Sequence, residues 1–297
     1  MPQSSLVVGP SGAPATVLVG IATQNRAALL PKALASAQAQ DCPGLQIAVI
    51  DDGSTDATPA LRTLHPDMRW ERNETMLGYM ACRNHLMRTA DAEFYVSLDD
   101  DAWFLQGDEI AVAVARMREN PRLAAIAFDI LSPDRPQVQT RSAPRPCSVF
   151  IGCGHLLRLA AVEAAGYYAP TPGTYGSEEK DLSLRLADLG FAIELLPGVH
   201  VWHEKAWQGR DWFPLHRSGV CNELVMTLRR CPAPDVLAVM PLKLVSYLGF
   251  WLRNPRYLRA GLAGVAAFLR HVGPVWRGRR PVQRATFWRM NKGFRIR

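Results

Sequence analysis

Two groups of aspartates lie directly after apolar segments of the chain. Asp51–Asp52 follow the run Gln46–Ile50, and Asp99–Asp101 follow the run Phe94–Leu98. Short apolar runs predict buried strands, and ligands of open α/β sheets bind beyond the carboxyl ends of such strands. Five carboxylates at one edge would repel one another unless a cation offset their charge. Because hard divalent cations take oxygen ligands, the pattern predicts a site for a metal-bound phosphate.

The elements that must position these carboxylates alternate between strand and helix. We predict strands at residues 15–22, 46–51, 68–71, 94–99, 124–130, 148–158 and 192–202. We predict helices at residues 27–39, 57–64, 78–89, 109–119, 160–165 and 178–189, and a polar, proline-rich loop at 132–146. This alternation favours a right-handed, mainly parallel sheet of the α/β class, Rossmann-like and flanked by helices.

The composition is that of a globular protein with a sizeable core. The chain has 297 residues, of which 48% are hydrophobic and 21% charged, so it suits one large domain or one domain with an appendage. We expect a flexible N-terminus at 1–14, a catalytic domain at 15–205 and a helical basic region at 206–297. The first residues lack a basic start and a sustained apolar stretch, so we expect a cytosolic protein. The six cysteines form no C-x-x-C pair, which favours reduced core residues over a zinc site or a disulfide framework.

Charge is divided unevenly along the chain. Residues 204–297 carry 18 Lys+Arg and 4 Asp+Glu, a net +14, which leaves −7 on residues 1–203 within the total of +7. The acidic part suits a metal site, and the basic, Trp-containing part suits an anionic surface.

The basic region contains two apolar stretches, residues 236–252 and 257–269. Neither predicts a membrane span, because Pro241 and Lys243 interrupt the first and the second is shorter than the roughly 20 residues that a span needs. Flanking arginines and tryptophans favour helices that lie in a membrane interface. Packing of these helices on the catalytic domain is the alternative. Nucleic acid is not expected, because no basic-aromatic RNA-binding motif accompanies the charge.

Five segments, in order, resemble a known family. They are Asn25-Arg26, Val49–Asp56, Leu98–Asp101, Gly176–Leu186 and Val201–His203. Together they resemble glycosyltransferase family 2, whose members have the GT-A nucleotide-sugar fold. The resemblance covers roughly residues 15–205, and a basic tail with apolar helices recurs in bacterial members. It implies inverting transfer of a sugar from a nucleotide-diphospho-sugar.

The resemblance implies a metal site at the Asp-x-Asp element, which is Asp99 and Asp101. These residues would bind Mg2+ or Mn2+ together with the donor diphosphate, and Asp100 would lie in the same donor site, directed away from the metal. A divalent cation there would neutralise the charge that develops on the departing nucleoside diphosphate. His203 is a third expected metal ligand, because a histidine ligates the metal here in some relatives. The alternatives are a solvated turn or helix cap for the aspartates and a structural role for His203.

The nucleotide pocket is expected around the first two strands and the helix that follows the third. By resemblance, Asp52 contacts the base or ribose. The remaining residues expected to border the pocket are Thr23, Asn25, Arg26, Arg83 and Asn84. Turn formation and helix capping are the alternative for Asp52 and Arg26.

The acidic helix start at residues 178–181 is the expected source of the catalytic base. An acceptor hydroxyl must lose its proton as it attacks the anomeric carbon, and a positioned carboxylate suits that task. Glu179 occupies the family's base position, where Asp is usual, and Asp181 is the second candidate. The alternative is simple stabilisation by the helix macrodipole. We expect the loop at 132–146 or at 173–177 to close over the donor and exclude water.

These observations predict a metal-dependent inverting glycosyltransferase that is peripheral at the inner face of the plasma membrane. The expected donor is a UDP- or dTDP-sugar, and the expected acceptor is a carbohydrate or lipid-linked hydroxyl in polysaccharide, glycolipid or glycoconjugate assembly. A nucleotidyltransferase is one alternative, although the sequence lacks an early glycine-rich, basic phosphate loop. A non-catalytic scaffold that binds sugar nucleotides or membrane partners is the other.

Overall fold

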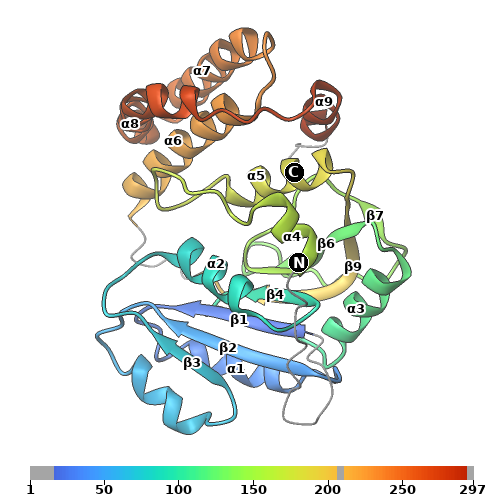
Figure 1. Ribbon diagram of the computed structural model, residues 1–297. Helices are drawn as coiled ribbons and strands as arrows, with labels where there is room; N and C mark the ends of the chain where they lie inside the picture. The colour runs from blue at the N-terminus through green and yellow to red at the C-terminus, as the bar shows by residue number, and fades with distance from the viewer. Residues whose placement is uncertain (1–16, 206–210, 293–297) are drawn as a thin grey trace. The chain divides into compact units, whose positions relative to one another are not determined.

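The computed structural model describes residues 17–205 and 211–292, which form two compact units (Figure 1). Unit 1 holds the described residues up to Tyr167 and residues 191–205. Unit 2 holds Tyr168–Gly190 and the described residues from Asp211 onward. The segment 168–190 therefore groups with the C-terminal helices, which differs from a single boundary near residue 205. The expected flexible segment 1–14 lies outside the described residues.

Unit 1 is built on one sheet, and four of its strands lie side by side in the order β3-β2-β1-β4 (Figure 1). The order continues β8-β6-β9-β5, and β7 pairs with β9. The described strands are β1 (Val17–Thr23), β2 (Leu45–Asp51), β3 (Arg69–Arg72), β4 (Phe94–Leu98), β5 (Ala102–Phe104), β6 (Leu123–Leu131), β7 (Arg145–Pro146), β8 (Gly154–Arg158) and β9 (Ala192–His203).

The sheet is mixed in direction. Among the described strands four pairings are parallel and four are antiparallel: β8 runs against its neighbours β4 and β6, and β5 and β7 run against β9. The predicted α/β class is confirmed. The parallel pairings are those among β3, β2, β1 and β4 and the pairing of β6 with β9, so the sheet is mixed rather than mainly parallel. Strand β8 begins at Gly154 and is shorter than the predicted strand at 148–158. Strands β5 and β7 were not predicted, since each has only two or three residues.

Helices pack on this sheet through apolar faces. They are α1 (Leu30–Gln38), the 3-10 helix η1 (Thr58–Leu64), α2 (Tyr79–Thr89), α3 (Glu109–Glu119) and α4 (Leu159–Ala165). Leu30 and Leu34 of α1 are fully buried together with Val19 of β1. Gly20 in β1 is required for close packing, because an added Cβ would lie 2.4 Å from the ring of Tyr95. The buried strands thus form a rigid base for the polar side chains at their ends.

Unit 2 is helical. It contains α5 (Glu178–Asp188), α6 (Trp212–Arg230), α7 (Val236–Arg253), the 3-10 helix η2 (Pro255–Tyr257), α8 (Leu258–Arg277) and α9 (Arg284–Lys292). Helix α7 agrees with the predicted apolar stretch at 236–252, and α8 extends beyond the predicted stretch at 257–269. Helix α6 was not predicted, because charged and polar residues interrupt its apolar positions.

Candidate metal centre

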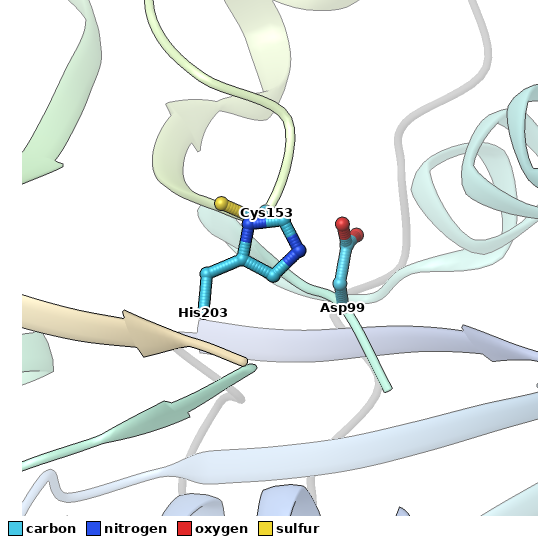
Figure 2. A group of neighbouring side chains, drawn as sticks. All are labelled: Asp99, Cys153 and His203. Atoms are coloured by element: carbon cyan, nitrogen blue, oxygen red, sulfur yellow. The ribbon is translucent and has the colours of Figure 1, made fainter. Parts of the chain in front are cut away.

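Three side chains of unit 1 form a group that fits a metal ion. One ligand atom from each of Asp99, Cys153 and His203 lies within 4.8 Å of the others (Figure 2). Asp99 directly follows β4 and Cys153 directly precedes β8. These strands pair antiparallel with Leu98 opposite Gly154, so the register brings Asp99 and Cys153 to the same end of the sheet. His203 is the last residue of β9.

Asp101 lies beside the same histidine. It precedes β5, whose first residue, Ala102, pairs with His203 in the antiparallel register of β5 and β9. The Oδ1 atom of Asp101 is 3.2 Å from Nε2 of His203, and Asp101 is 3% exposed. Both aspartates of the predicted Asp-x-Asp element therefore lie next to the predicted histidine ligand.

Arg83 connects Asp99 with the loop that carries Cys153. Its guanidinium forms an ion pair with Oδ1 of Asp99 and donates a hydrogen bond of 3.1 Å to the carbonyl of Gly152. Arg83 is buried, so its charge compensates Asp99 with little solvent screening. Asn84 follows it on α2 and is half-buried. The expected placement of Arg83 near the aspartates is thus observed, while its contact with a nucleotide stays a prediction.

His155 holds the same loop from the interior of the sheet. The side chain is buried, and its Nδ1 lies 2.9 Å from the carbonyl oxygen of Ile151. Burial lowers the pKa of His155 to about 3, and the nearby charge of Arg83 adds to this shift. The imidazole is therefore neutral at pH 7, and Nδ1 carries the proton because a carbonyl oxygen can only accept. This hydrogen bond fixes the loop just before Cys153.

Asp100 lies in a buried setting at the same end of the sheet. Its pKa is raised to about 7, mainly by burial and in part by the negative charge of Asp101, against the opposing effect of the Thr23 hydroxyl. Arg26 partly offsets this charge, with its Nε 3.6 Å from the carboxylate of Asp100. A cation among these carboxylates would relieve the remaining repulsion. The structure therefore brings Thr23, Arg26 and Asp100 together, while their contact with a nucleotide sugar stays a prediction.

Asp52 and Asn25 have structural partners. The carboxylate of Asp52 accepts hydrogen bonds from Asn73 Nδ2 (2.7 Å) and from the backbone amides of Leu77 (2.9 Å) and Gly78 (2.8 Å). The Oδ1 atom of Asn25 accepts from the amides of residues 55 and 56 at 2.7 and 3.2 Å. Asp52 thus fixes the loop at 73–78, and Asn25 fixes the turn after β2. These are turn-forming roles of the kind given as the alternative, and their contact with a nucleotide stays a prediction.

The two candidate bases belong to unit 2 and differ in environment. Asp181 is 4% exposed and forms ion pairs with Arg185 (2.8 Å) and Arg230 (2.6 Å). Burial raises its pKa, but the two guanidinium groups outweigh burial and hold the pKa below its usual value. A carboxylate held in this way is a weak base and a structural anchor, which disfavours Asp181 as the base. Glu179 is half-buried in the first turn of α5 and is the better candidate.

A half-buried charged cluster fixes the start of α5. Glu223 of α6 accepts from Ser177 Oγ (2.9 Å) and Lys180 Nζ (2.7 Å), and it also pairs with Lys243 of α7. Asn222 holds the preceding loop, since its Oδ1 accepts from the amide of Gly173 at 2.8 Å. Within unit 2 these contacts define where Glu179 lies on α5.

The donor set fits a divalent cation. Carboxylate oxygen suits Mg2+ and Mn2+, imidazole nitrogen suits many transition metals, and sulfur favours softer ions such as Zn2+. The cysteine spacing predicts reduced core residues, and Cys153 is buried in the core cluster as expected. It was not predicted as a ligand. Its place directly before Gly154, which pairs with Leu98, brings it close to Asp99.

Comparison with solved structures identifies the class of the fold. Residues 1–349 of TarS from S. aureus, in complex with UDP-GlcNAc, match with a TM-score of 0.63 and 17% identity over 89% of this chain and 84% of that one. The mannosyltransferase PcManGT from Pyrobaculum calidifontis, in complex with GDP-Man and Mn2+, matches with a TM-score of 0.60 and 22% identity over 86% and 75%. GalNAc-T7 with UDP, GalNAc and Mn2+ matches at 0.59 and 15% over 74% of this chain and 48% of that one. The chain therefore has the GT-A glycosyltransferase fold.

The family is defined by the sequence of the same domain. Residues 18–160 match the model of glycosyl transferase family 2. The chain thus carries a domain of glycosyltransferase family 2, which confirms the predicted resemblance. Comparison with curated protein sequences gave no significant match.

Proposed function

We propose that this protein is a metal-dependent, inverting glycosyltransferase that moves a sugar from a nucleoside-diphosphate sugar to a hydroxyl acceptor. The observation that carries the proposal is the convergence of Asp99, Asp101 and His203 at the strand ends of a family 2 domain. Neighbours of the same fold bind GDP-Man and UDP-GlcNAc, which supports a nucleoside-diphosphate sugar as donor. A UDP- or dTDP-sugar is the donor we expect.

In the reaction the acceptor oxygen forms a bond to the anomeric carbon while the bond from that carbon to the diphosphate oxygen breaks. The electron pair of the broken bond goes to the nucleoside diphosphate, and the acceptor proton goes to the carboxylate of Glu179. A divalent cation held by Asp99, Asp101 and His203 would supply neutralisation of the charge on the departing diphosphate. Arg83 and His155 fix the side chains and the loop around this charge, so little reorganisation is needed.

The acceptor is proposed to be a carbohydrate or a lipid-linked hydroxyl in polysaccharide, glycolipid or glycoconjugate assembly. The division of charge supports a reaction at the inner face of the plasma membrane, because residues 204–297 carry a net +14 that an anionic surface would attract.

The test is a screen of nucleoside-diphosphate sugars by thermal shift with Mn2+, followed by an assay for released nucleoside diphosphate. We expect Asp99→Asn to lose the Mn2+-dependent shift and at least about 100-fold of kcat/KM, because the cation loses a charged ligand. Glu179→Gln should keep the shift and lose about 100-fold or more of kcat, as expected for a missing base. Glu163→Gln, an exposed change on α4, is the matched control and should alter neither.

Two outcomes would reject the proposal. Donor binding without release of nucleoside diphosphate, across carbohydrate and lipid-linked acceptors, would indicate a scaffold. Release of pyrophosphate from a nucleoside triphosphate would indicate a nucleotidyltransferase.

A further inference from the structure

Helix α7 exposes apolar side chains, whereas its lysine is paired with another helix. Its single lysine, Lys243, forms an ion pair with Glu223 of the neighbouring helix α6. Five of its large apolar side chains are exposed by 48 to 73%, namely Leu237, Leu242, Val245, Leu248 and Leu252. The helix is also apolar and long enough to cross a membrane by length and composition, although only 11% of its apolar segment is buried. A helix on a soluble surface buries its apolar stripe and exposes its charges, so the outer face of α7 suits an apolar environment.

The inner face of α7 is held by neighbouring helices of unit 2. Trp251 is 3% exposed and donates from Nε1 to Nε2 of His216 on α6 at 2.9 Å. Its ring packs on Gly261 of α8, where an added Cβ would lie 2.1 Å from the ring. Because one face is fixed to protein and includes the Lys243–Glu223 pair, lipid cannot surround the helix. Its 18 residues are therefore suited to lie along an apolar surface rather than to cross a bilayer.

Charge around this face is of one sign. No Asp or Glu follows Asp235 in the sequence, whereas residues 236–297 contain 13 Lys+Arg. Exposed arginines lie at the end of α7, in η2 and along α8, namely Arg253, Arg256, Arg259, Arg270 and Arg277. The exposed indoles of Trp212 and Trp276 accompany them. Apolar side chains surrounded by arginine and tryptophan match the layered chemistry of an anionic lipid surface.

The turn between α7 and α8 has a hollow of about 170 Å3. It is lined by Trp212, Phe213, Arg256, Tyr257 and Ala260. A single guanidinium among aromatic walls suits a phosphate group attached to an apolar chain, since the charge binds the phosphate and the rings contact the chain. The hollow lies in the same unit and next to the end of α7.

We propose that unit 2 docks on an anionic lipid bilayer through α7, which lies in the plane of the membrane interface. The leucine face of α7 enters the boundary between headgroups and acyl chains. The arginines of η2 and α8 contact lipid phosphates, with one phosphate in the hollow at the turn. This inference concerns where the protein binds, and it does not depend on the proposed sugar transfer.

Vesicle co-sedimentation of the full chain tests the apolar part. The probes are sealed vesicles of phosphatidylcholine alone and of phosphatidylcholine with 30% phosphatidylglycerol, a probe composition of about the charge that attracts basic segments. We expect the wild type to bind the anionic vesicles and V245E/L248E to bind at least about tenfold more weakly, because two exposed apolar side chains become charged. The matched control is Leu64→Glu, on an equally exposed leucine of unit 1, which should bind as the wild type does.

A second pair of variants tests the arginines. R256Q/R259Q should lower binding to anionic vesicles about 30-fold, because each basic residue near the surface contributes about fivefold. R118Q/R122Q removes the same charge from exposed positions of unit 1 and should have little effect. Binding of V245E/L248E equal to that of the wild type would overturn the proposal. So would a soluble dimer that V245E/L248E abolishes without any vesicle binding, or protease protection that shows α7 crossing sealed vesicles.

Discussion

His203 lies close to both aspartates of the Asp-x-Asp element. Its Nε2 is 3.2 Å from Asp101, and it shares a group with Asp99 and Cys153 (Figure 2). The position follows from pairing of the short strand β5 with the end of β9, which places residue 203 opposite Ala102. A metal bound by the aspartates would therefore have a nitrogen ligand fixed by the sheet itself.

We expect His203→Ala to weaken Mn2+ binding by about tenfold or more, since a nitrogen ligand is lost while the carboxylates remain. The measurement is Mn2+ titration by electron paramagnetic resonance, with UDP present. Zn2+ or Co2+ binding should fall more than Mn2+ binding in Cys153→Ser, because sulfur favours the softer ions.

His85→Ala is the matched control for the histidine. His85 is exposed on α2 and pairs only at the surface with Glu71, among the contacts seen in the described residues. Its removal should leave the affinity for Mn2+ unchanged. An unchanged affinity in His203→Ala would instead assign that histidine to the alternative, structural role.

At the scale of elements, α5 is held in place by charges that it shares with α6 and α7. Glu223 lies between Lys180 and Lys243, and Asp181 lies between Arg185 and Arg230. Although burial raises its pKa, the two ammonium groups hold the pKa of Glu223 at about 2, below its usual 4.5. The stabilisation from this carboxylate is therefore fully present above about pH 4.5 and is lost as the pH falls toward 2.

We expect Glu223→Gln to lower the free energy of unfolding at pH 7 by about 2 to 3 kcal/mol, because two half-buried cations lose their anionic partner. The difference from wild type should narrow below pH 4.5 and vanish only below pH 2, where most of the wild-type carboxylate is protonated as well. Urea unfolding followed by circular dichroism over this pH range measures the free energy of unfolding of both proteins.

Glu119→Gln provides the comparison for an exposed carboxylate. Its side chain is 65% exposed and pairs with Arg116 on the surface of α3. Glu119→Gln should change the free energy of unfolding by less than about 1 kcal/mol. A similarly small effect of Glu223→Gln at pH 7 would show that solvent screens the half-buried cluster.

The elements also show which features of the fold and the site can be predicted from the sequence. The strands ending near Asp51 and Asp99 were predictable because apolar β-forming runs stop at carboxylates. The direction of β8 was not, because strand direction depends on how the chain crosses the sheet rather than on local composition. The cysteine spacing correctly predicts that Cys153 is a core residue, but its place beside Asp99 and His203 depends on strand pairing, which the spacing does not contain. The hydrogen bonds of Asp52 could not be predicted either, because the amides of Leu77 and Gly78 that it binds lie 25 and 26 residues away in sequence.

At the scale of the whole molecule, the candidate metal centre and the candidate base belong to different compact units. Asp99, Asp101 and His203 lie in unit 1, whereas Glu179 lies in unit 2 with the C-terminal helices. The chain leaves unit 1 at residue 168 and returns to it at residue 191, so the proposed sugar transfer would draw on residues of both units. The two units are thus interleaved in sequence rather than joined end to end.

A chain that ends at residue 205 tests this arrangement. Without α6 and α7, Asp181 loses Arg230 and Lys180 loses Glu223, which leaves buried charges of α5 without these partners. We expect amides of residues 168–190 to exchange hydrogen much faster than in the full chain and sugar transfer to fall below detection. Mn2+ binding should stay within about twofold of the full chain, because its expected ligands all lie in unit 1.

Hydrogen exchange followed by mass spectrometry measures the protection of residues 168–190, and Mn2+ titration measures metal affinity. Protection of residues 168–190 equal to that in the full chain would mean that contacts other than these ion pairs hold α5.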